Sequence, residues 1–193
     1  MRIVSGKYKG KRFDVPHTFK ARPTTDFAKE GLFNILSNVY VDFDEEPSAL
    51  DLFSGTGSIS LEFLSRGCGN VVSIEKDFKH YQFLQKVAHE LNDNKWHPLH
   101  ADVFKYLNSF VSSDESNVGI NSSSLGFDIV FADPPYALEN LGSIPDIVFQ
   151  PGMKLLNQDG LFILEHGKDY NFEQHPHFID HRNYGSVNFS FFK

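Results

Sequence analysis

The residues best suited to chemistry are Asp133, Pro134, Pro135 and Tyr136, which directly follow a short apolar run at 127–132. This run has the length and nearly continuous apolar character of a strand covered on both faces of a parallel sheet. Because two successive prolines can continue neither a strand nor a helix, Asp133 is left at the carboxyl end of the strand, where open α/β sheets bind ligands. A carboxylate acceptor, a stiff turn and an aromatic ring suit a planar substrate that carries an amine. Taken alone, the stretch is better explained as a strand-ending turn with a solvated aspartate.

A second set of residues has the arrangement that a nucleoside site requires. The segment 51–57 ends one predicted strand and opens a helix, and its glycines allow a sharp turn and a close approach to a ligand. Glu75 and Asp102 end the next two predicted strands, where an acid can bind ribose hydroxyls. Either acid alone is better explained as a strand-end carboxylate or a helix cap, so the hypothesis depends on the combination. The predicted cofactor residues are Asp51, Phe53, Gly55, Gly57, Glu75, Asp102 and Asp133.

The residue at position 60 helps to indicate which nucleoside the predicted site would bind. Dinucleotide fingerprints have a third glycine where this chain has Ser60, so a pyrophosphate ligand is less favoured. S-adenosylmethionine (SAM) has no phosphate. It requires acids for its ribose and a neutral-to-acidic surrounding for its sulfonium and amino groups. The acid-rich edge therefore favours SAM and disfavours a nicotinamide oxidoreductase.

Alternating strands and helices position these residues. The predicted ranges are strands 49–53, 70–75, 96–100, 127–132 and 160–165, helices 57–66, 78–91, 103–110 and one within 143–156, and a closing antiparallel pair at 178–183 and 186–192. A further helix is predicted at 26–37, because its apolar residues recur at helical spacing. Successive β-α units imply an α/β fold with a mostly parallel sheet and helices on both faces. The Ser-, Asn- and Gly-rich segment 111–126 is predicted to be a mobile loop.

Residues 1–22 form a predicted basic hairpin arm ahead of the main domain at 23–193. Short strands at 2–5 and 11–15 are expected to flank a glycine turn and to pack on the main body. The arm carries seven basic residues against Asp14, a net charge of +6, so the remainder of this chain of net charge −7 carries −13. This asymmetry suggests a polyanionic partner, although a solvated, lysine-rich hairpin is about equally compatible with the charge alone. The predicted phosphate contacts are Arg2, Lys7, Lys9, Lys11, Arg12 and Arg22.

Length and composition narrow the class of protein. A chain of 193 residues fits one good-sized domain with a small appendage. It has no long apolar run and no apolar signal core, so neither a membrane span nor secretion is expected. The single cysteine, Cys68, excludes an internal disulfide, and we expect a monomer in the reducing cytoplasm. His175 and His177 are separated by a proline and lack an array of acids, so no metal site is predicted.

Several motifs resemble a known family of enzymes. The Asp-Pro-Pro-Tyr sequence at 133–136, with the Asp-x-Phe-x-Gly-x-Gly sequence at 51–57, looks like the SAM-dependent amino-methyltransferases. The residues Arg-Pro-Thr-Thr-Asp at 22–26, followed by Glu30 and Leu-Phe-Asn at 32–34, resemble the RsmD family, the bacterial 16S rRNA guanine-N2 methyltransferases. Further matches lie at 2–6, 61–62, 64–66, 74–75 and 184–185, so the resemblance covers nearly the whole chain.

The resemblance implies a Rossmann-like class I methyltransferase with a seven-stranded sheet, SAM as co-substrate, and 16S rRNA of the small ribosomal subunit as partner. It implies that Asp133 and the backbone carbonyl of Pro134 accept both hydrogens of the target amine, and that Tyr136 stacks on a flipped-out base. The Asp-Pro-Pro-Tyr motif alone would bind an amine of adenine or cytosine equally well. A DNA adenine-N6 or cytosine-N4 methyltransferase and a non-catalytic RNA-binding protein of the same fold therefore remain alternatives. Arg22 and Thr24 border either the SAM pocket or the RNA, and the sequence does not separate these roles.

Overall fold

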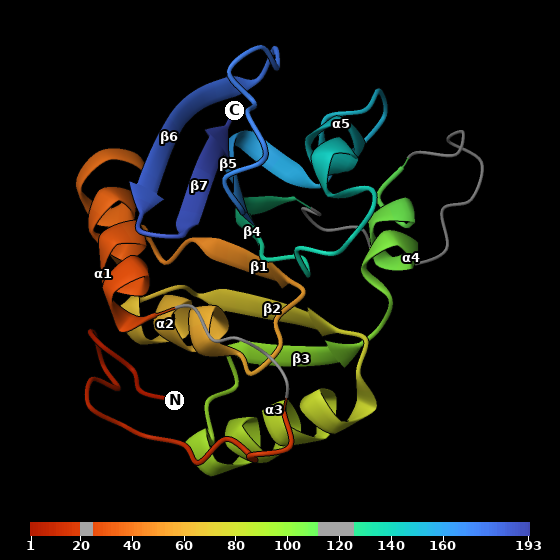
Figure 1. The fold of residues 1–193 in the computed structure, drawn as a ribbon. Helices are drawn as coiled ribbons and strands as arrows, with labels where there is room; N and C mark the ends of the chain where they lie inside the picture. The colour runs from red at the N-terminus through yellow and green to blue at the C-terminus, as the bar shows by residue number, and fades with distance from the viewer. Residues whose placement is uncertain (20–24, 112–125) are drawn as a thin grey trace.

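A seven-stranded sheet forms the centre of the molecule (Figure 1), in the strand order β3-β2-β1-β4-β5-β7-β6. The structure is a computed structural model that describes residues 1–19, 25–111 and 126–193. The strands are β1 (Ser48–Leu52), β2 (Asn70–Glu75), β3 (Trp96–His100), β4 (Phe127–Ala132), β5 (Leu156–His166), β6 (Phe178–Tyr184) and β7 (Val187–Phe192). Strands β1 to β5 are parallel, whereas β7 is antiparallel to both β5 and β6. The predicted mostly parallel α/β sheet is therefore confirmed.

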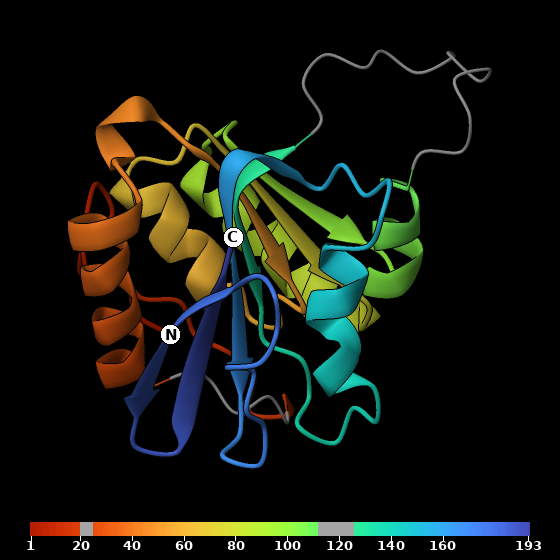
Figure 2. The same cartoon turned by 90° about the horizontal axis from the view of Figure 1, so that it is seen from above.

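Helices cover both faces of the sheet (Figure 2). They are α1 (Asp26–Ile35), which continues into a π-helical turn at Leu36–Tyr40, α2 (Ser58–Arg66), α3 (Phe78–Leu91), α4 (Val103–Asn108) and α5 (Ile144–Val148). Alternate residues of β4 divide the core. Phe131 packs with the apolar sides of α1, α2 and α3, whereas Val130 packs with α4 and α5. This alternation explains why β4 is apolar along nearly its whole length.

The helix starts are fixed by residues that can be read from the sequence. Thr25 caps α1 by accepting a hydrogen bond from the backbone N–H of Ala28 at 3.2 Å. Asp77 caps α3 in the same way, with the N–H groups of Lys79 and His80 at 2.8 and 3.0 Å. Each helix of the described residues is too short or too polar to cross a bilayer.

The predicted element ranges need few corrections. Those of β2, β3, β4 and α3 coincide with the observed ones, but β5 begins earlier than predicted, at Leu156, and pairs there with Phe127. The prediction of a mobile loop at 111–126 concerns residues that lie mostly outside the described ranges. At its first residue, Val111 forms an isolated bridge to Met153.

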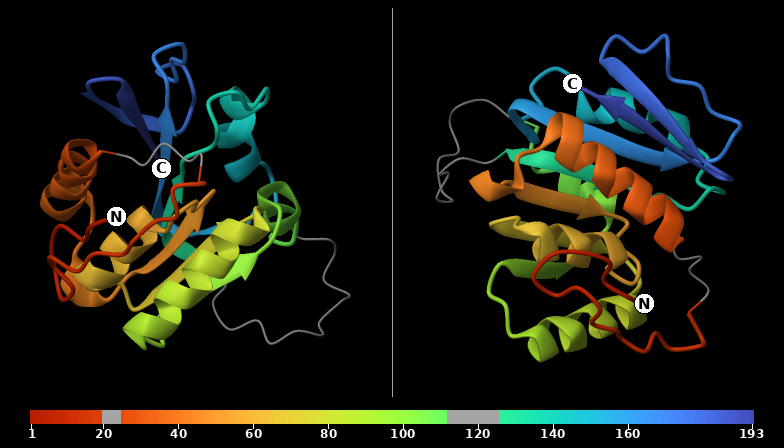
Figure 3. Two further views of the ribbon diagram at one scale, coloured as in Figure 1. Left: turned by 60° about the horizontal axis from the view of Figure 1, so that its bottom comes forward. Right: turned by 90° about the vertical axis from the view of Figure 1, so that its left-hand side faces the viewer.

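The N-terminal segment differs from its prediction. The predicted hairpin is present, but its pairing is shorter than strands at 2–5 and 11–15: an antiparallel bridge joins Arg2 to Arg12, and backbone hydrogen bonds of 3.0 Å join Ile3 to Lys11 and Phe13 to Met1. The reason is that the N–H groups of Val4 and Ser5 donate to the Glu62 carboxylate on α2, at 3.0 and 2.9 Å, rather than to a partner strand. Figure 3 shows this segment lying across the outside of α2.

Candidate active site

The ends of β1, β2 and β4 bring the predicted chemical residues to one edge of the sheet. Leu52 of β1 pairs with Ile74 of β2 on one side and with Ala132 of β4 on the other. The next residue after β4 is Asp133, whose N–H donates to the Leu52 carbonyl at 3.4 Å. The catalytic candidate and the glycine turn therefore start from adjacent strands, β4 and β1.

The turn that follows β1 has an unusual backbone. Phe53, Gly55 and Gly57 have positive φ angles of 62°, 53° and 76°. A positive φ is strained for a phenylalanine, and such strain persists where the surrounding structure requires that conformation. A Cβ on Gly57 would lie 2.7 Å from a methyl group of Leu84 and 3.2 Å from the ring of Trp96. Glycine is thus required at 57 for two independent reasons, its backbone angle and the neighbouring side chains.

Glu75 closes this turn from β2. Its carboxylate accepts hydrogen bonds from the N–H of Gly55 at 2.7 Å and from that of Asp77 at 2.6 Å. The acid that the sequence assigned to ribose hydroxyls therefore lies directly against the glycine turn. Its position fits a nucleoside held between the turn and the end of β2.

Asp102 has a structural role in addition to its predicted one. Its carboxylate accepts from the N–H groups of Phe104 and Lys105 and so caps α4. It also pairs with the ammonium of Lys76 at 2.9 Å, and this pairing is the first cause that holds the pKa of Asp102 below its usual value. A role in cofactor binding stays a prediction for Asp102.

A chain of hydrogen bonds ends on Asp51. The indole N–H of Trp96 donates to the Ser73 hydroxyl at 2.7 Å, and Ser73 donates to Ser60 at 2.6 Å. Ser60 in turn donates to the Asp51 carboxylate through both its hydroxyl and its N–H. The serine that replaces the third glycine of a dinucleotide fingerprint therefore orients the first acid of the site. No sequence signal indicated these hydrogen bonds, because their members come from four different elements.

Buried acids gather beneath the site. Burial raises the pKa of Asp51 to about 7. Burial, followed by the charges of Glu165 and Asp51, holds the pKa of Asp133 well above its usual range. Glu165 lies one residue before the end of β5 and is only 4% exposed. Three acids in a site of low dielectric favour a cationic ligand.

Tyr136 lies at the open side of this acid group. Its ring is 46% exposed. A Cβ on Gly167 would lie 3.7 Å from a carbon of this ring, so the ring lies beside the backbone just after β5. An exposed ring next to Asp133 has the position that stacking on a base requires.

The predicted phosphate contacts fall into different groups. Lys9, Lys11 and Arg12 are exposed, whereas Arg2 pairs with Asp26 at 2.9 Å and Lys7 with Asp93 at 3.3 Å. Arg22, together with Thr24, lies outside the described residues. These positions do not test whether the six residues contact RNA, so their assignment as phosphate contacts stays a prediction.

Buried groups that the sequence did not identify fasten the arm to the helices. Lys29, only 1% exposed, donates to the backbone carbonyl of Arg2 at 2.7 Å and to the Ser58 hydroxyl at 3.1 Å. Its ammonium lies 3.7 Å from the fully buried carboxylate of Glu62, which also binds the arm backbone. Burial is the main cause that lowers the pKa of Lys29. Since Ser58 directly follows the glycine turn, one buried ion pair contacts both the arm and the first residue of α2.

The sheet order, the antiparallel β7, and the glycine turn and acids at the carboxyl edge together define a Rossmann-like class I methyltransferase. The residues fit SAM, because the space beside Gly55 is nearly open, with only the Phe53 carbonyl oxygen within 4 Å of an added Cβ, and because the buried acids suit a positive charge.

The comparisons with known proteins specify the family. The model of the family described as conserved hypothetical protein 95 matches residues 1–193. A curated relative, the uncharacterized methylase RP545 of Rickettsia prowazekii, is 30% identical over 96% of this chain and 94% of its own. Ribosomal RNA small subunit methyltransferase D of Escherichia coli is 32% identical over 70% of this chain and 60% of its own. The chain belongs to the conserved hypothetical protein 95 family, and the predicted membership in the RsmD family of SAM-dependent methyltransferases is confirmed.

Solved structures agree with the fold. The hypothetical protein TTHA0928 of Thermus thermophilus superimposes with a TM-score of 0.80 at 24% identity, over 100% of this chain and 99% of its own. A Thermus thermophilus 16S rRNA N2 methyltransferase, RsmC, in complex with AdoMet and guanosine has a TM-score of 0.63 at 20% identity, over 93% of this chain and 46% of its own. At these identities the likeness concerns the fold alone.

Proposed function

We propose that this enzyme transfers a methyl group from SAM to the exocyclic N2 amine of a guanine in 16S rRNA. The observation that carries the proposal is the position of Asp133, Pro134 and Tyr136 at the end of β4, beside the glycine turn and the buried acids. The names of the relatives, ribosomal RNA small subunit methyltransferase D, support rRNA as the substrate class. The choice of guanine N2 is supported by the family resemblance.

In the proposed mechanism, the protein positions and polarises the amine. The lone pair of a guanine N2 is delocalised into the ring, so the nitrogen is a poor nucleophile until its hydrogens are held out of plane. Asp133 and the Pro134 carbonyl would each accept one hydrogen, which directs the lone pair away from them. SAM supplies an electrophilic methyl group on a sulfonium. As the new N–C bond forms, the S–C bond breaks, and the excess proton on nitrogen leaves to water. No strong base is needed, so orientation and electrostatics would account for most of the rate.

Tyr136 and the arm would bind the RNA. Tyr136 would stack on the extruded base, and the exposed Lys9, Lys11 and Arg12 would contact phosphates. Binding would then weaken steeply as the salt concentration rises. We further propose that the enzyme acts as a cytoplasmic monomer on rRNA within the small subunit.

Mapping the methylated base tests the proposed substrate. Purified protein is incubated with labelled SAM and with small subunits that lack the modification, and naked 16S rRNA and duplex DNA are run in parallel. We expect label on the N2 of one guanine in rRNA. Label on adenine or cytosine of DNA would instead support the DNA methyltransferase alternative, and the absence of label on every substrate would support the non-catalytic one.

Substitution of Asp133 tests the mechanism. Asp133→Ala should lower turnover about 100-fold or more, since it removes a pre-oriented acceptor, and should change SAM affinity only a few-fold. Asp133→Asn is the matched control, because its amide oxygen can still accept one hydrogen and should preserve part of the activity. Full activity in Asp133→Ala, measured by single-turnover methylation, would exclude this role.

Charge reversal tests the arm. Lys9→Glu combined with Lys11→Glu should weaken RNA binding at physiological salt and reduce the slope of log affinity against log salt. Both side chains are exposed, and the arm is held through backbone groups, so the variant should remain folded. Unchanged methylation and an unchanged salt slope would show that the arm does not contact the RNA.

A further inference from the structure

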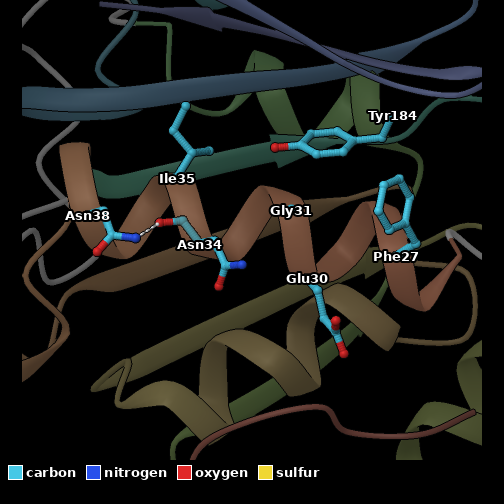
Figure 4. Close-up of a pocket in the computed structure, with 7 residues that line it drawn as sticks. All are labelled: Phe27, Glu30, Gly31, Asn34, Ile35, Asn38 and Tyr184. Carbon is cyan, nitrogen blue, oxygen red and sulfur yellow. Dashed lines mark hydrogen bonds between the residues drawn. The ribbon is translucent and has the colours of Figure 1, made fainter.

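A groove lies on the outer side of α1, away from the acids of the proposed site. It has a volume of about 390 Å³ and is formed between α1 and the end of β6 (Figure 4). Its apolar part consists of Ile35 and the rings of Phe27 and Tyr184. Its polar part consists of Glu30 and Asn34 of α1 and Asn38 of the π-helical turn that follows. None of these residues has a part in the proposed mechanism.

The groove opens near the same sheet edge as Asp133. Tyr184 is the last residue of β6, and it pairs with Val187 across the turn that leads to β7. The next residue of β7, Asn188, pairs with His166, the last residue of β5. Three strand spacings, roughly 14 Å, therefore separate the end of β4 from the end of β6. A few nucleotides of single-stranded RNA can cover that distance.

The aromatic part of the groove is exposed and ordered. Phe27 is 68% exposed, and its ring contacts that of Tyr184 edge to face, with 5.8 Å between the centroids and 78° between the planes. Tyr184 lies flat against α1 at Gly31, where a Cβ would come within 2.1 Å of a ring carbon. Gly31 thus allows the ring to lie directly on the helix backbone, and the pair presents an aromatic surface to solvent.

The polar groups favour a base rather than a phosphate. Glu30 lies at the rim of the groove with its exposed carboxylate directed away from the two rings (Figure 4), where it would repel a phosphate but can accept hydrogen bonds from the amine or imino edge of a base. Asn34 offers both a donor and an acceptor on the next turn of the helix. Arg2 of the arm is held at the first turn of α1 by Asp26 at 2.9 Å, and it can contact a phosphate that adjoins the groove. The groove is also too small for a packed protein helix, which has a diameter of about 10 Å.

We propose that this groove binds one unpaired nucleotide of the RNA substrate that flanks the methylated base. The base stacks on Phe27 beside Tyr184 and places its polar edge against Glu30 and Asn34. Stacking on aromatic side chains together with contacts to base edges is the usual mode by which proteins bind single-stranded RNA. The proposal rests on the proposed rRNA substrate, and it adds a second contact that would help to select the sequence or shape around the target.

Direct RNA binding tests the groove independently of methylation. Fluorescence anisotropy is measured with labelled 16S rRNA fragments and wild-type protein, Phe27→Ser and Phe27→Trp. Phe27→Ser should weaken binding about tenfold, since loss of one stacked base costs about 1–3 kcal/mol. Phe27→Trp should bind like the wild type, and SAM affinity should be unchanged in both variants. Because Phe27 is largely exposed, both variants should fold, as thermal denaturation will show.

Phe78→Ser is the matched control. Phe78 is an exposed ring, 56% accessible, in the first turn of α3 at the opposite end of the sheet. The Phe78→Ser variant should bind RNA as tightly as the wild type. Equal losses in Phe27→Ser and Phe78→Ser, or no loss in Phe27→Ser, would overturn the proposal. A wild-type dimer that Phe27→Ser dissociates in sedimentation would assign the groove to a second copy of the chain and overturn it as well.

Failure of the proposed methylation reaction can be distinguished from failure of the groove to bind RNA. Wild-type protein that binds the rRNA fragment without methylating it would refute the reaction, while the comparison of Phe27→Ser with wild type would still decide the groove. Cross-linking of RNA that carries photoreactive uridines should attach to peptides of α1 in the wild type. Absence of any α1 cross-link from an RNA that binds would count against the groove.

Discussion

A change of pH should reveal the buried acids through their effect on SAM binding. Asp51 has its pKa raised to about 7 by burial, and Asp133 has a pKa that is raised in the same direction. A sulfonium next to these groups favours their ionised forms, so the bound state should release a proton that the free protein still holds at low pH. SAM should therefore bind more tightly as the pH rises.

The size of the expected change in SAM affinity can be worked out from the ionisation of Asp51 alone. If Asp51 must be ionised in the complex, the observed Kd is multiplied by 1 + 10^(pKa−pH), which is about 11 at pH 6 and about 1.1 at pH 8. We therefore expect about a tenfold gain in SAM affinity between these two values. Titration of Asp133 would add to the gain, because its pKa is shifted in the same direction.

Isothermal titration calorimetry at pH 6 and 8 measures this effect. S-adenosylhomocysteine lacks the sulfonium charge and should show a smaller change with pH. Asp51→Asn should also flatten the SAM profile, since it removes one titrating acid and one of the charges that raise the pKa of Asp133. A wild-type SAM affinity that is equal at both pH values, or a slope unchanged in Asp51→Asn, would refute the reasoning.

The same acid should make the free protein less stable as the pH rises. The pKa of Asp51 is higher in the folded protein than its ordinary value of 3.8, so the folded state holds a proton that the unfolded chain has lost. Its contribution to stability is complete below about pH 3.8 and is lost as the pH rises through about 7, by up to roughly 4 kcal/mol. Comparing the Tm of wild type and Asp51→Asn from pH 5 to 8 isolates this contribution.

Two further predictions concern the buried ion pair and the glycine turn. Lys29→Met should destabilise the protein by about 1–3 kcal/mol in urea denaturation, because it removes the buried donor to the Arg2 carbonyl and leaves Glu62 with Arg66 as its remaining cation, whereas Lys95→Met in an exposed pair should cost about 1 kcal/mol or less. Equal costs would show that the buried pair has no special role. Gly57→Ala should weaken SAM binding about tenfold or more, the equivalent of ~1.4 kcal/mol, whereas Gly10→Ala has a similar positive φ, has no atoms within 4 Å of its new Cβ and should bind SAM normally. An unchanged SAM affinity in Gly57→Ala would remove the turn from the cofactor site.

The fold and the strand-end residues were predictable because they depend on local signals. The apolar run of β4 and the prolines after it locate Asp133, and the same logic locates Glu75 at the end of β2. Ser60, Ser73 and Glu165 could not be assigned in this way. Their roles depend on which strands become neighbours, and strand order is a property of the whole chain.

Charge counting failed to identify what fastens the arm, for a related reason. The sequence separates a positive segment from a negative body, and this suggests a polyanionic partner but does not indicate how the arm is attached. The contacts that hold the arm are instead hydrogen bonds from its backbone to buried side chains, chiefly Glu62 and Ser65. An exposed lysine contributes little to such packing, so the exposed side chains of Lys9, Lys11 and Arg12 remain available for a partner.

This separation of roles has a consequence for the enzyme. Ile3 and Phe13 are buried in the same core cluster as Leu61 of α2, so the arm is packed as firmly as the helix that follows the glycine turn. Lys29 then joins the Arg2 carbonyl to Ser58, the first residue of that helix. RNA held by the arm and SAM held by the turn would therefore be positioned by one rigid unit. In a reaction that needs no strong base, this alignment of the two substrates is the main contribution that the fold can make to the rate.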